Sequence, residues 1–305
     1  MAEPSNDLPP LGGAERPPSG LTRLSERVRR IVAPNPSPFT FTGTCVYIVG
    51  EGEVAVVDPG PANPAHLDAL LAAIPGERVT RVVVTHSHRD HAAGAALLKA
   101  RTGAAIVGAR AHVAAEGKPT RADASHALDY APDETLEDGA RVAGRGFTLE
   151  AVATPGHAAN HLSFALVEEN ALFSGDHVMA WSTSAIAPPD GSMRAYLASL
   201  EKVARRGEAI YWPGHGGPVR EPRRYVRALI SHRRQREAAI LARLEAGEAN
   251  VAEIVARVYP SLAPALVGAA SLSTLAHLVD LTERGLATSD GAIPRGARFR
   301  RAGHL

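Results

Sequence analysis

The sequence predicts an α+β protein, in which a layered body of strands and helices is followed by a smaller, mainly helical part. Two observations favour this class. Short apolar runs bounded by Gly, Pro and Asp alternate with helical apolar spacing up to about residue 215, whereas after Pro222 the spacing is helical over three successive segments. With 305 residues, 45% of them hydrophobic, the chain can hold one large domain and one small domain.

Residues 1–20 are rich in Pro and Gly and predict a flexible leader. The body, residues 21–220, begins with a strand over 39–50, a hairpin turn and a second strand over 54–57. Apolar runs predict further strands over 81–85, 104–107, 147–153, 162–167, 171–174 and 209–212. Helical spacing predicts helices over 64–74, 92–102 and 195–204.

Residues 221–305 form the predicted C-terminal domain. Helical spacing covers 225–245, 251–258 and 271–284, and glycines end the first and last of these helices. Two short extended pieces follow within 286–299, around Asp290-Gly291 and Pro294. Three helices followed by a small β-wing resemble a winged-helix module.

Composition and charge limit the classes of function. The net charge is only +1, so the whole chain lacks polyanion-binding character, although the segment from Arg220 onward carries 14 Arg against 8 Asp or Glu. That basic tail either contacts phosphates or is a solvated surface. Cys45 is the only cysteine, which excludes an intrachain disulfide. Because no signal segment or membrane-spanning run is present, we expect a cytoplasmic protein without a membrane partner.

The most informative segment is 85–91, which follows an apolar run and contains His86, His88, Asp90 and His91. Since His86 and His88 are two positions apart on an extended segment, their side chains point the same way. Neutral imidazole and carboxylate are usual ligands of zinc, and zinc bound by them can generate hydroxide at neutral pH. The segment therefore predicts a metal site at a strand end, where layered α/β folds place their chemistry.

Three further turns carry candidate ligands, each beside a glycine that permits a close approach. They end at or contain His157, Asp176 and His215. Asp58 lies in an Asp-Pro-Gly turn, for which a purely structural role is one interpretation. His161, four residues after His157, either lines the substrate site or has a supporting or surface position, and His177, directly after Asp176, is expected to pack beside the site. The remaining histidines have no motif context and are expected on the surface or in the core; they are His66, His112, His126, His232, His277 and His304.

The order of these motifs, H-x-H-x-D-H, H, D and H after Asp58-Pro59-Gly60, resembles the metallo-β-lactamase superfamily. The resemblance implies a four-layer αββα fold and a site for two zinc ions, where iron or manganese would also fit. By matching position, the first metal would be held by His86, His88 and His157, the second by Asp90, His91 and His215, with Asp176 as the bridge. Asp90 and Asp58 are the candidate catalytic carboxylates, and Asp58 would act by orienting the histidine segment.

Further segments resemble the β-lactamase-like protein 2 family, whose animal members are endoribonucleases for single-stranded RNA and end in a small winged-helix domain. These segments are 24–28, 35–40, 43–50, 211–218 and 231–237. Relatives of this shape also include thioester hydrolases. One position departs from the family, which has Asn where this chain has Cys45. A buried, inert thiol is favoured there over a nucleophile.

Three functions are compatible with these residues. The favoured one, a zinc-dependent hydrolase of a small ester, thioester or lactone, needs only the metal site. An endoribonuclease would also hold RNA with basic residues, for which the candidates are Arg223, Arg224, Arg227, Arg233, Arg234 and Arg236. A non-enzymatic nucleic-acid-binding regulator is disfavoured, because the 271–284 helix has one basic residue, Arg284. The segment 177–194, which contains Trp181, is expected to border the substrate entrance. The sequence is compatible with a homodimer but does not predict the oligomeric state.

Overall fold

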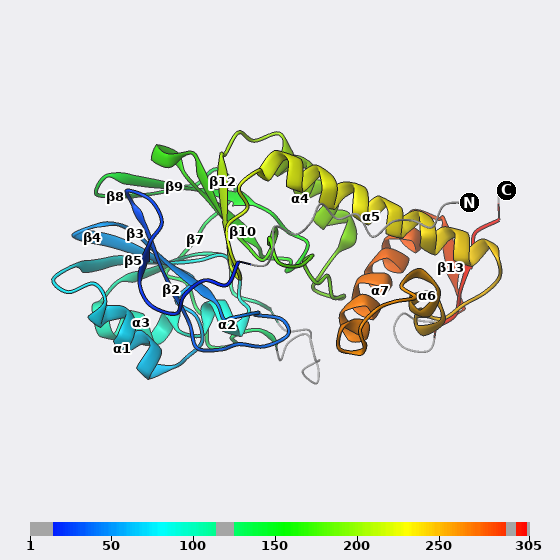
Figure 1. The fold of residues 1–305 in the computed structure, drawn as a ribbon, viewed down its shortest axis with the longest axis horizontal. Coiled ribbons are helices and arrows are strands. Elements are labelled where there is room, and N and C mark those ends of the chain that lie inside the picture. Colours follow the sequence, from blue (N-terminus) through cyan, green and yellow to red (C-terminus); the bar gives the residue numbers. More distant parts are fainter. Residues whose placement is uncertain (1–14, 114–124, 291–296, 304–305) are drawn as a thin grey trace.

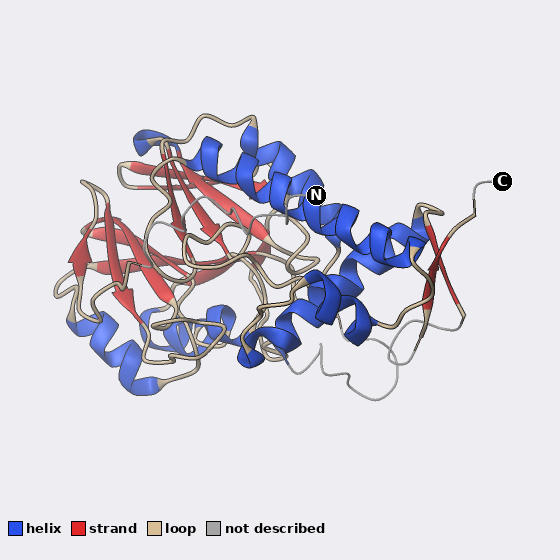
Figure 2. Cartoon of the chain, turned by 45° about the vertical axis from the view of Figure 1, so that its right-hand side comes forward, coloured by secondary structure: helices blue, strands red, loops and turns tan. Residues whose placement is uncertain are grey.

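Two β-sheets packed face to face form the centre of the computed structural model, and helices cover both outer faces (Figures 1 and 2). The structure describes residues 15–113, 125–290 and 297–303. Most of the predicted leader, residues 1–14, therefore lies outside the described residues. Residues 15–18, at the end of that leader, have no regular secondary structure.

The first sheet has seven strands in the order β1-β2-β3-β4-β5-β6-β7. Strands β1 to β4 pair antiparallel, whereas β4 to β7 pair parallel. Because the parallel strands end at one edge of the sheet, the loops that follow them lie close together. The strands are β1 Thr22–Arg23, β2 Val28–Val32, β3 Cys45–Glu51, β4 Glu53–Val57, β5 Arg78–Val84, β6 Ala105–Gly108 and β7 Glu134–Thr135.

The second sheet has five strands in the order β12-β11-β10-β9-β8, of which only β11 and β12 pair parallel. The strands are β8 Arg141–Gly144, β9 Phe147–Ala153, β10 Leu162–Leu166, β11 Ala171–Gly175 and β12 Ile210–Pro213. The facing surfaces of the two sheets share one apolar cluster, which includes Val83, Phe147 and Phe164. Burial of this surface holds the sandwich together, at roughly 25 cal/mol per Å².

Helices complete the four layers. Leu67 and Leu98 pack against the outer face of the first sheet, and Leu200 and Leu229 pack against the outer face of the second. The helices of the first sheet are α1 Pro64–Ala72, α2 Arg89–Ala92 and α3 Ala95–Thr102, and those of the second are α4 Met193–Ala204 and the start of α5 Pro222–Glu245. The αββα fold that the resemblance implies is therefore confirmed.

The chain after the middle of α5 builds a core of its own, to the right of the sandwich in Figure 1. Its elements are α6 Val251–Val258, α7 Val267–Glu283, β13 Ala287–Ser289 and β14 Phe299–Arg301. Phe299 is fully buried among residues of α5, α6 and α7. Helices followed by a two-stranded sheet agree with the winged-helix prediction. The turn predicted at Gly291 and Pro294 lies outside the described residues.

Some predicted element bounds were wrong. The strand predicted over 39–50 begins only at Cys45, because residues 37–43 form turns in which Phe41 has a φ of 57°. Strand β2 was not predicted, since Arg29 and Arg30 interrupt its apolar pattern. Both arginines are nevertheless buried, and Arg29 forms an ion pair of 2.5 Å with Glu77. An apolar pattern alone cannot reveal a strand with two buried arginines, one of which is paired by a residue far away in the sequence.

Helix α5 connects the two parts of the chain. It begins at Pro222, packs along α4 and continues into the C-terminal core, so one helix contributes to both cores (Figure 1). The domain boundary at residues 220 and 221 stays a prediction. None of the described helices combines the length and the apolar composition that crossing a bilayer requires.

Candidate metal centre

The candidate ligands lie on loops that follow strands. The segment from His86 to His91 follows β5, His157 follows β9, Asp176 follows β11 and His215 follows β12. The sequence predicted each of these positions, and the structure brings them together in groups of possible metal ligands. Because the loops begin at buried strands, the side chains are held in place by rigid elements.

The first group contains His86, His88 and His157. Nε2 of His86 and Nε2 of His157 each lie 3.0 Å from Nδ1 of His88. A tetrahedral zinc ion with bonds of about 2.0–2.1 Å separates its ligand atoms by roughly 3.3 Å. The outer nitrogen of His157, Nδ1, donates to the carbonyl of Ala185 at 2.7 Å, which orients the ring with Nε2 toward the group.

The second group contains Asp90, His91 and His215. Nε2 of His91 and Nε2 of His215 are 3.3 Å apart. Oδ2 of Asp90 lies 3.4 Å from the first of these nitrogens and 3.2 Å from the second. Nδ1 of His215 is 3.2 Å from the carbonyl of Gly43, to which it can donate. This set of two imidazoles and one carboxylate suits a divalent metal as well as the first group does.

Asp176 lies between the two groups. Its Oδ2 is 3.5 Å from Nε2 of His157, while its Oδ1 is 3.4 Å from Nε2 of both His91 and His215. Although Oδ1 is buried, it makes no well-aligned hydrogen bond with any described residue. A buried carboxylate oxygen without a partner is costly, and a metal ion on either side would satisfy it. The residues therefore fit a pair of metal ions with Asp176 as the bridge.

Asp58 contacts the nitrogen of His91 that faces away from the second group. Its Oδ1 accepts from the backbone N–H of Thr85, and its Oδ2 accepts from the Thr85 hydroxyl, both at 2.8 Å. Nδ1 of His91 lies 2.8 Å from the same Oδ2. This contact fixes the tautomer of His91, with Nε2 directed at the group. The alternative that Asp58 only shapes a turn does not account for its contact with His91.

The electrostatics of the two groups differ. Burial, and then the neighbouring histidines, lower the pKa of His86 well below its usual value and that of His88 to about 3, so both rings are neutral, as metal ligands must be. In the second group burial acts in the same direction, but the carboxylates outweigh it and raise the pKa of His215 to about 9. The carboxylates of this group therefore need a nearby cation, either a proton on the imidazoles or a metal ion.

Glycine allows two of these loops to approach the ligands. A Cβ at Gly214 would lie 2.5 Å from Oδ1 of Asp176 and 2.6 Å from Cε1 of His91. Gly175 has a φ of 49°, and a Cβ there would lie 2.6 Å from Nε2 of His161. A side chain at either position would displace a candidate ligand or its support, which is the reason that the sequence places Gly beside them.

His177 lies beside the site, as expected, and His161 has the supporting position that was one of its alternatives. The backbone N–H of Asp176 donates to Nε2 of His161 at 3.1 Å, and Nδ1 of His161 is 2.9 Å from the hydroxyl of Thr154. His161 thus holds the backbone of the bridging residue. His177 is buried, with its ring centroid 5.1 Å from that of Tyr196.

The sequence did not reveal a further group at this site. His126, expected only on the surface or in the core, places its ring centroid 4.7 Å from that of His88. Its Nδ1 is 2.7 Å from the hydroxyl of Ser87, and its Nε2 is 3.5 Å from Oδ2 of Asp190. His88, His126 and Asp190 together form another possible metal-ligand group. Neither His126 nor Asp190 stands in a recognisable motif, so only the fold could bring them to His88.

Cys45 and Trp181 lie near His215. The thiol of Cys45 is fully buried, donates to the carbonyl of Gly216 at 3.4 Å, and has its pKa raised to about 11 by burial. It matches the inert thiol expected from the sequence. The ring of Trp181 stacks on Phe41 with centroids 5.0 Å apart and lies against Gly216. Its role at a substrate entrance stays a prediction.

Comparison with known proteins agrees with this geometry. Residues 39–215 match the Metallo-beta-lactamase superfamily, and residues 251–296 match the Beta-lactamase associated winged helix domain. The Beta-lactamase-like protein 2 homolog of Caenorhabditis elegans is 31% identical over 225 residues, which cover 72% of each chain. Atrochrysone carboxyl ACP thioesterase of Aspergillus fumigatus is 32% identical over 229 residues, 73% of this chain and 66% of the fungal protein.

Solved structures share the fold over nearly the whole chain. A metallo-beta-lactamase family protein from Thermus thermophilus has a TM-score of 0.73 at 24% identity, covering 92% of this chain and 100% of that one. A Beta-lactamase domain protein from Burkholderia ambifaria has a TM-score of 0.78 at 19% identity, covering 98% and 96%. The chain therefore belongs to the metallo-β-lactamase superfamily and carries a β-lactamase-associated winged-helix domain after its αββα sandwich.

Proposed function

We propose that this protein is a hydrolase that binds two zinc ions and cleaves a small ester, thioester or lactone. The observation that carries the proposal is the position of Asp176, whose two carboxylate oxygens face two separate groups of ligand atoms. The first ion would be held by His86, His88 and His157, the second by Asp90, His91 and His215, and Asp176 would bridge them. Iron or manganese would also fit these ligands.

When bound, such a pair of metals supplies a hydroxide nucleophile at neutral pH and polarises the bond to be cleaved. Asp58 and Thr85 keep Nε2 of His91 directed at the site. The side chain of Asp90 is 29% exposed, against 10% for Asp176 and 3% for Asp58, so it is the carboxylate that solvent reaches best. Although burial opposes it, His91 lowers the pKa of Asp90, which keeps this carboxylate ionised, as a ligand of a divalent metal must be.

A thioester is the substrate that we favour within this class. One relative with 32% identity is named as an acyl carrier protein thioesterase. Hydrolysis of a thioester or an ester requires only the metal groups, which would supply the hydroxide and polarise the carbonyl. It does not require an extended surface for a polymer.

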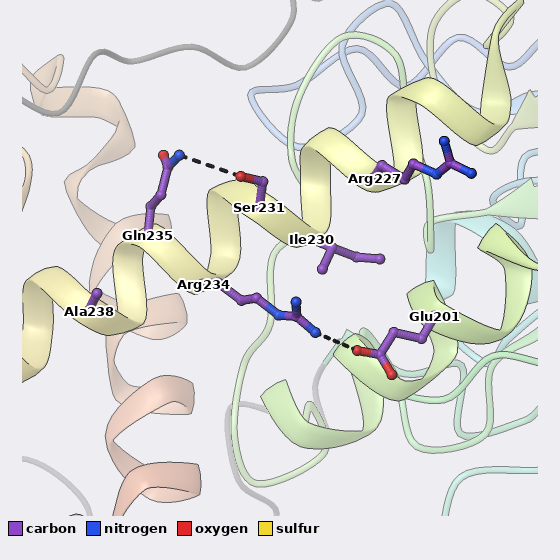
Figure 3. Close-up of a pocket in the computed structure, with 7 residues that line it drawn as sticks. All are labelled: Glu201, Arg227, Ile230, Ser231, Arg234, Gln235 and Ala238. Carbon is purple, nitrogen blue, oxygen red and sulfur yellow. Dashed lines mark hydrogen bonds and ion pairs between the residues drawn. The ribbon is translucent and has the colours of Figure 1, made fainter.

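The RNA alternative loses support, because four of the six arginines expected to hold RNA are buried or paired with a glutamate. The other two, Arg223 and Arg227, are exposed, and Arg227 shares a groove with Arg234. Arg233 and Arg236 are buried, at 2% and 5% exposure. Arg224 pairs with Glu221 at 3.0 Å, and Arg234 pairs with Glu201 at 2.8 Å. Figure 3 shows this second pair beside a groove of about 560 Å³ between α4 and α5, whose lining contains none of the candidate metal ligands. Buried or paired guanidinium groups are poorly placed to bind phosphates.

Hydrolysis of a set of acyl thioesters of different chain lengths, followed through the released thiol, tests the proposal. We expect turnover by the zinc-loaded protein, and loss of turnover after chelation and in His88→Ala, because His88 contributes Nδ1 to the first group. Circular dichroism serves as the control that His88→Ala is folded. A labelled single-stranded RNA is tested in parallel. Cleavage of RNA alone, or thioester turnover that survives in metal-free His88→Ala, would contradict the proposal.

A further inference from the structure

Helix α5 buries one guanidinium group between α4 and the loop that follows Asp176. Arg233 is only 2% exposed, and its Nη2 donates to the carbonyl of Ser184 at 2.5 Å. The guanidinium carbon lies 5.3 Å from the ring centroid of Tyr196 on α4. Arg233 thereby joins α5 to the loop that follows the bridging Asp176.

The residues that Arg233 contacts also hold two candidate metal ligands. The hydroxyl of Ser184 donates to the carbonyl of Asp176 at 2.6 Å. The next residue along the chain, Ala185, accepts at its carbonyl from Nδ1 of His157 at 2.7 Å. An anchor on the carbonyl of Ser184 therefore fixes two neighbouring residues. The Ser184 hydroxyl holds the backbone of Asp176, and the Ala185 carbonyl orients the ring of His157.

A second contact acts on the same loop. The hydroxyl of Tyr196, over whose ring Arg233 lies, donates to the carbonyl of His177 at 3.1 Å. The hydroxyl of Ser184 is 3.0 Å from that same carbonyl. The peptide just after Asp176 is thus held by two side chains, and Arg233 contacts both residues that provide them.

The charge of Arg233 argues against a purely space-filling role. Removing a guanidinium from water is costly unless it is paired, yet Arg233 forms no ion pair with any described residue, and its Nε is buried without a partner. Its charge also acts on its neighbours: burial, and then Arg233, lower the pKa of His277 to about 3. A neutral residue of similar length would fill the same space without this cost. What it would lose is the directed hydrogen bond to Ser184.

We propose that Arg233 is a positioning residue, through which α5, the helix that joins the sandwich to the winged-helix domain, sets the metal affinity of the site by holding Ser184 and Ala185 against Asp176 and His157. The proposal rests on the proposed metal centre but not on the identity of the substrate. It also gives helix α5 a role at the metal site that does not involve nucleic acid.

The helix offers a matched control. Arg236, three residues further along α5, is 5% exposed, donates from Nη1 to the carbonyl of Val258 at 3.1 Å and lies 4.9 Å from the ring centroid of Tyr259. It thus has the burial, the carbonyl contact and the aromatic contact of Arg233, but the carbonyl and the ring that it contacts belong to the C-terminal core. Its Nε donates to Nε2 of His232 within α5 at 3.3 Å. Arg234, between them, points outward to Glu201 (Figure 3). Substitution of Arg236 reports what loss of a buried arginine does when the metal loop is left intact.

The experiment measures zinc affinity by competition with a chromophoric chelator for the full-length wild type, Arg233→Met, Arg236→Met and Ser184→Ala. We expect Arg233→Met to weaken zinc binding by about 10-fold or more, as loss of a group that orients a ligand does. Ser184→Ala, which removes the donor to the Asp176 carbonyl and leaves Arg233 in place, should change the affinity in the same direction. Arg236→Met should lower the melting temperature without changing zinc affinity.

The outcomes separate the two proposals. Wild-type protein that binds no metal would overturn the proposed function and this inference with it. Wild-type protein that binds zinc, while Arg233→Met matches Arg236→Met in affinity, would overturn the inference alone. If Arg233→Met does not fold, Ser184→Ala decides, and an unchanged zinc affinity in that variant overturns the inference.

Discussion

Around the metal centre, residues that are not candidate ligands hold the candidate ligands in place by hydrogen bonds. Asp58 contacts both Thr85 and His91, His161 holds the backbone of Asp176, and Ala185 orients His157. Each proposed ligand named here is thus fixed by a second residue, which limits the number of orientations that it samples. Substitutions in this supporting layer should therefore change metal affinity without removing a ligand.

Replacing Asp58 by Asn tests this at one position. Asn tolerates the φ of 50° that Asp58 adopts, but its amide lacks the charge and one of the acceptor oxygens that Thr85 and His91 use. We expect zinc affinity to fall roughly 10- to 100-fold, as measured by chelator competition. Asp68→Asn, on an exposed part of α1, is the control. Equal affinities for the two variants would show that Asp58 only shapes its turn.

The reactivity of Cys45 is a second prediction for a single side chain. Burial raises the pKa of its thiol to about 11, so little thiolate is present at pH 8. We expect iodoacetamide to modify Cys45 slowly in native protein and rapidly after unfolding in urea, as followed by mass spectrometry. Rapid labelling of the native protein would argue that the thiol is accessible and reactive.

Among the helices, α6 shows most clearly how local sequence sets the start of an element. The Asn250 side chain accepts from the backbone N–H of Glu253, and the Glu253 carboxylate accepts from the backbone N–H of Asn250. These bonds satisfy N–H groups that a helix start leaves without partners. Such a cap acts on the stability of the C-terminal core and not on the metal site.

Loss of this cap should destabilise the protein by a moderate amount. We expect Asn250→Ala to lower the free energy of unfolding by about 1 kcal/mol, whereas Asn250→Asp keeps an acceptor and should change it little. Urea unfolding followed by circular dichroism measures both. Zinc affinity should be the same in the two variants, and a loss of stability in Asn250→Asp equal to that in Asn250→Ala would contradict the capping role.

At the scale of the whole molecule, buried histidines link stability to pH. His277 lies on α7, and burial, followed by the charges of Arg233 and His232, lowers its pKa to about 3. In the unfolded chain its pKa is about 6.5. Between these values the unfolded state binds the proton and the folded state does not, so the stability that is fully present above pH 6.5 falls as the pH falls toward 3.

His277→Leu should flatten that dependence. Between pH 7 and pH 5 the histidine is expected to cost about 2 kcal/mol of stability, from roughly 1.4 kcal/mol per pH unit below 6.5. Urea unfolding of wild type and His277→Leu at both pH values isolates this contribution, because the other titrating groups are common to the two proteins. If the free energy of unfolding fell by the same amount in wild type and His277→Leu, His277 would be protonated in the folded state as well as in the unfolded state.

Removal of the metals should also affect the whole fold. The second group holds carboxylates whose charge needs a cation, so a bound metal is expected to stabilise the native state by mass action. Chelation should lower the melting temperature of the wild type, measured by differential scanning fluorimetry, and should lower that of His88→Ala much less. An identical loss in both proteins would indicate that the chelator acts elsewhere.

Much of this protein follows from its sequence alone. The apolar runs and the residues after them determined the main strands of both sheets and all seven candidate ligands, because each ligand is local to the strand that carries it. The helical spacing after Pro222 determined the helices of the C-terminal segment, although α7 begins at Val267 instead of residue 271.

Only the tertiary structure decided the contacts between distant segments. Strand β2 depends on Glu77, which pairs with Arg29 from 48 residues away, and Arg233 meets Ser184 across 49 residues. His126 approaches His88, and His161 supports Asp176, through loops whose positions depend on the packing of two sheets. Periodicity and motifs encode what a residue does within its own element. The partner of a buried charge or imidazole is chosen by the packing of elements far apart in the chain, so no local pattern could specify it.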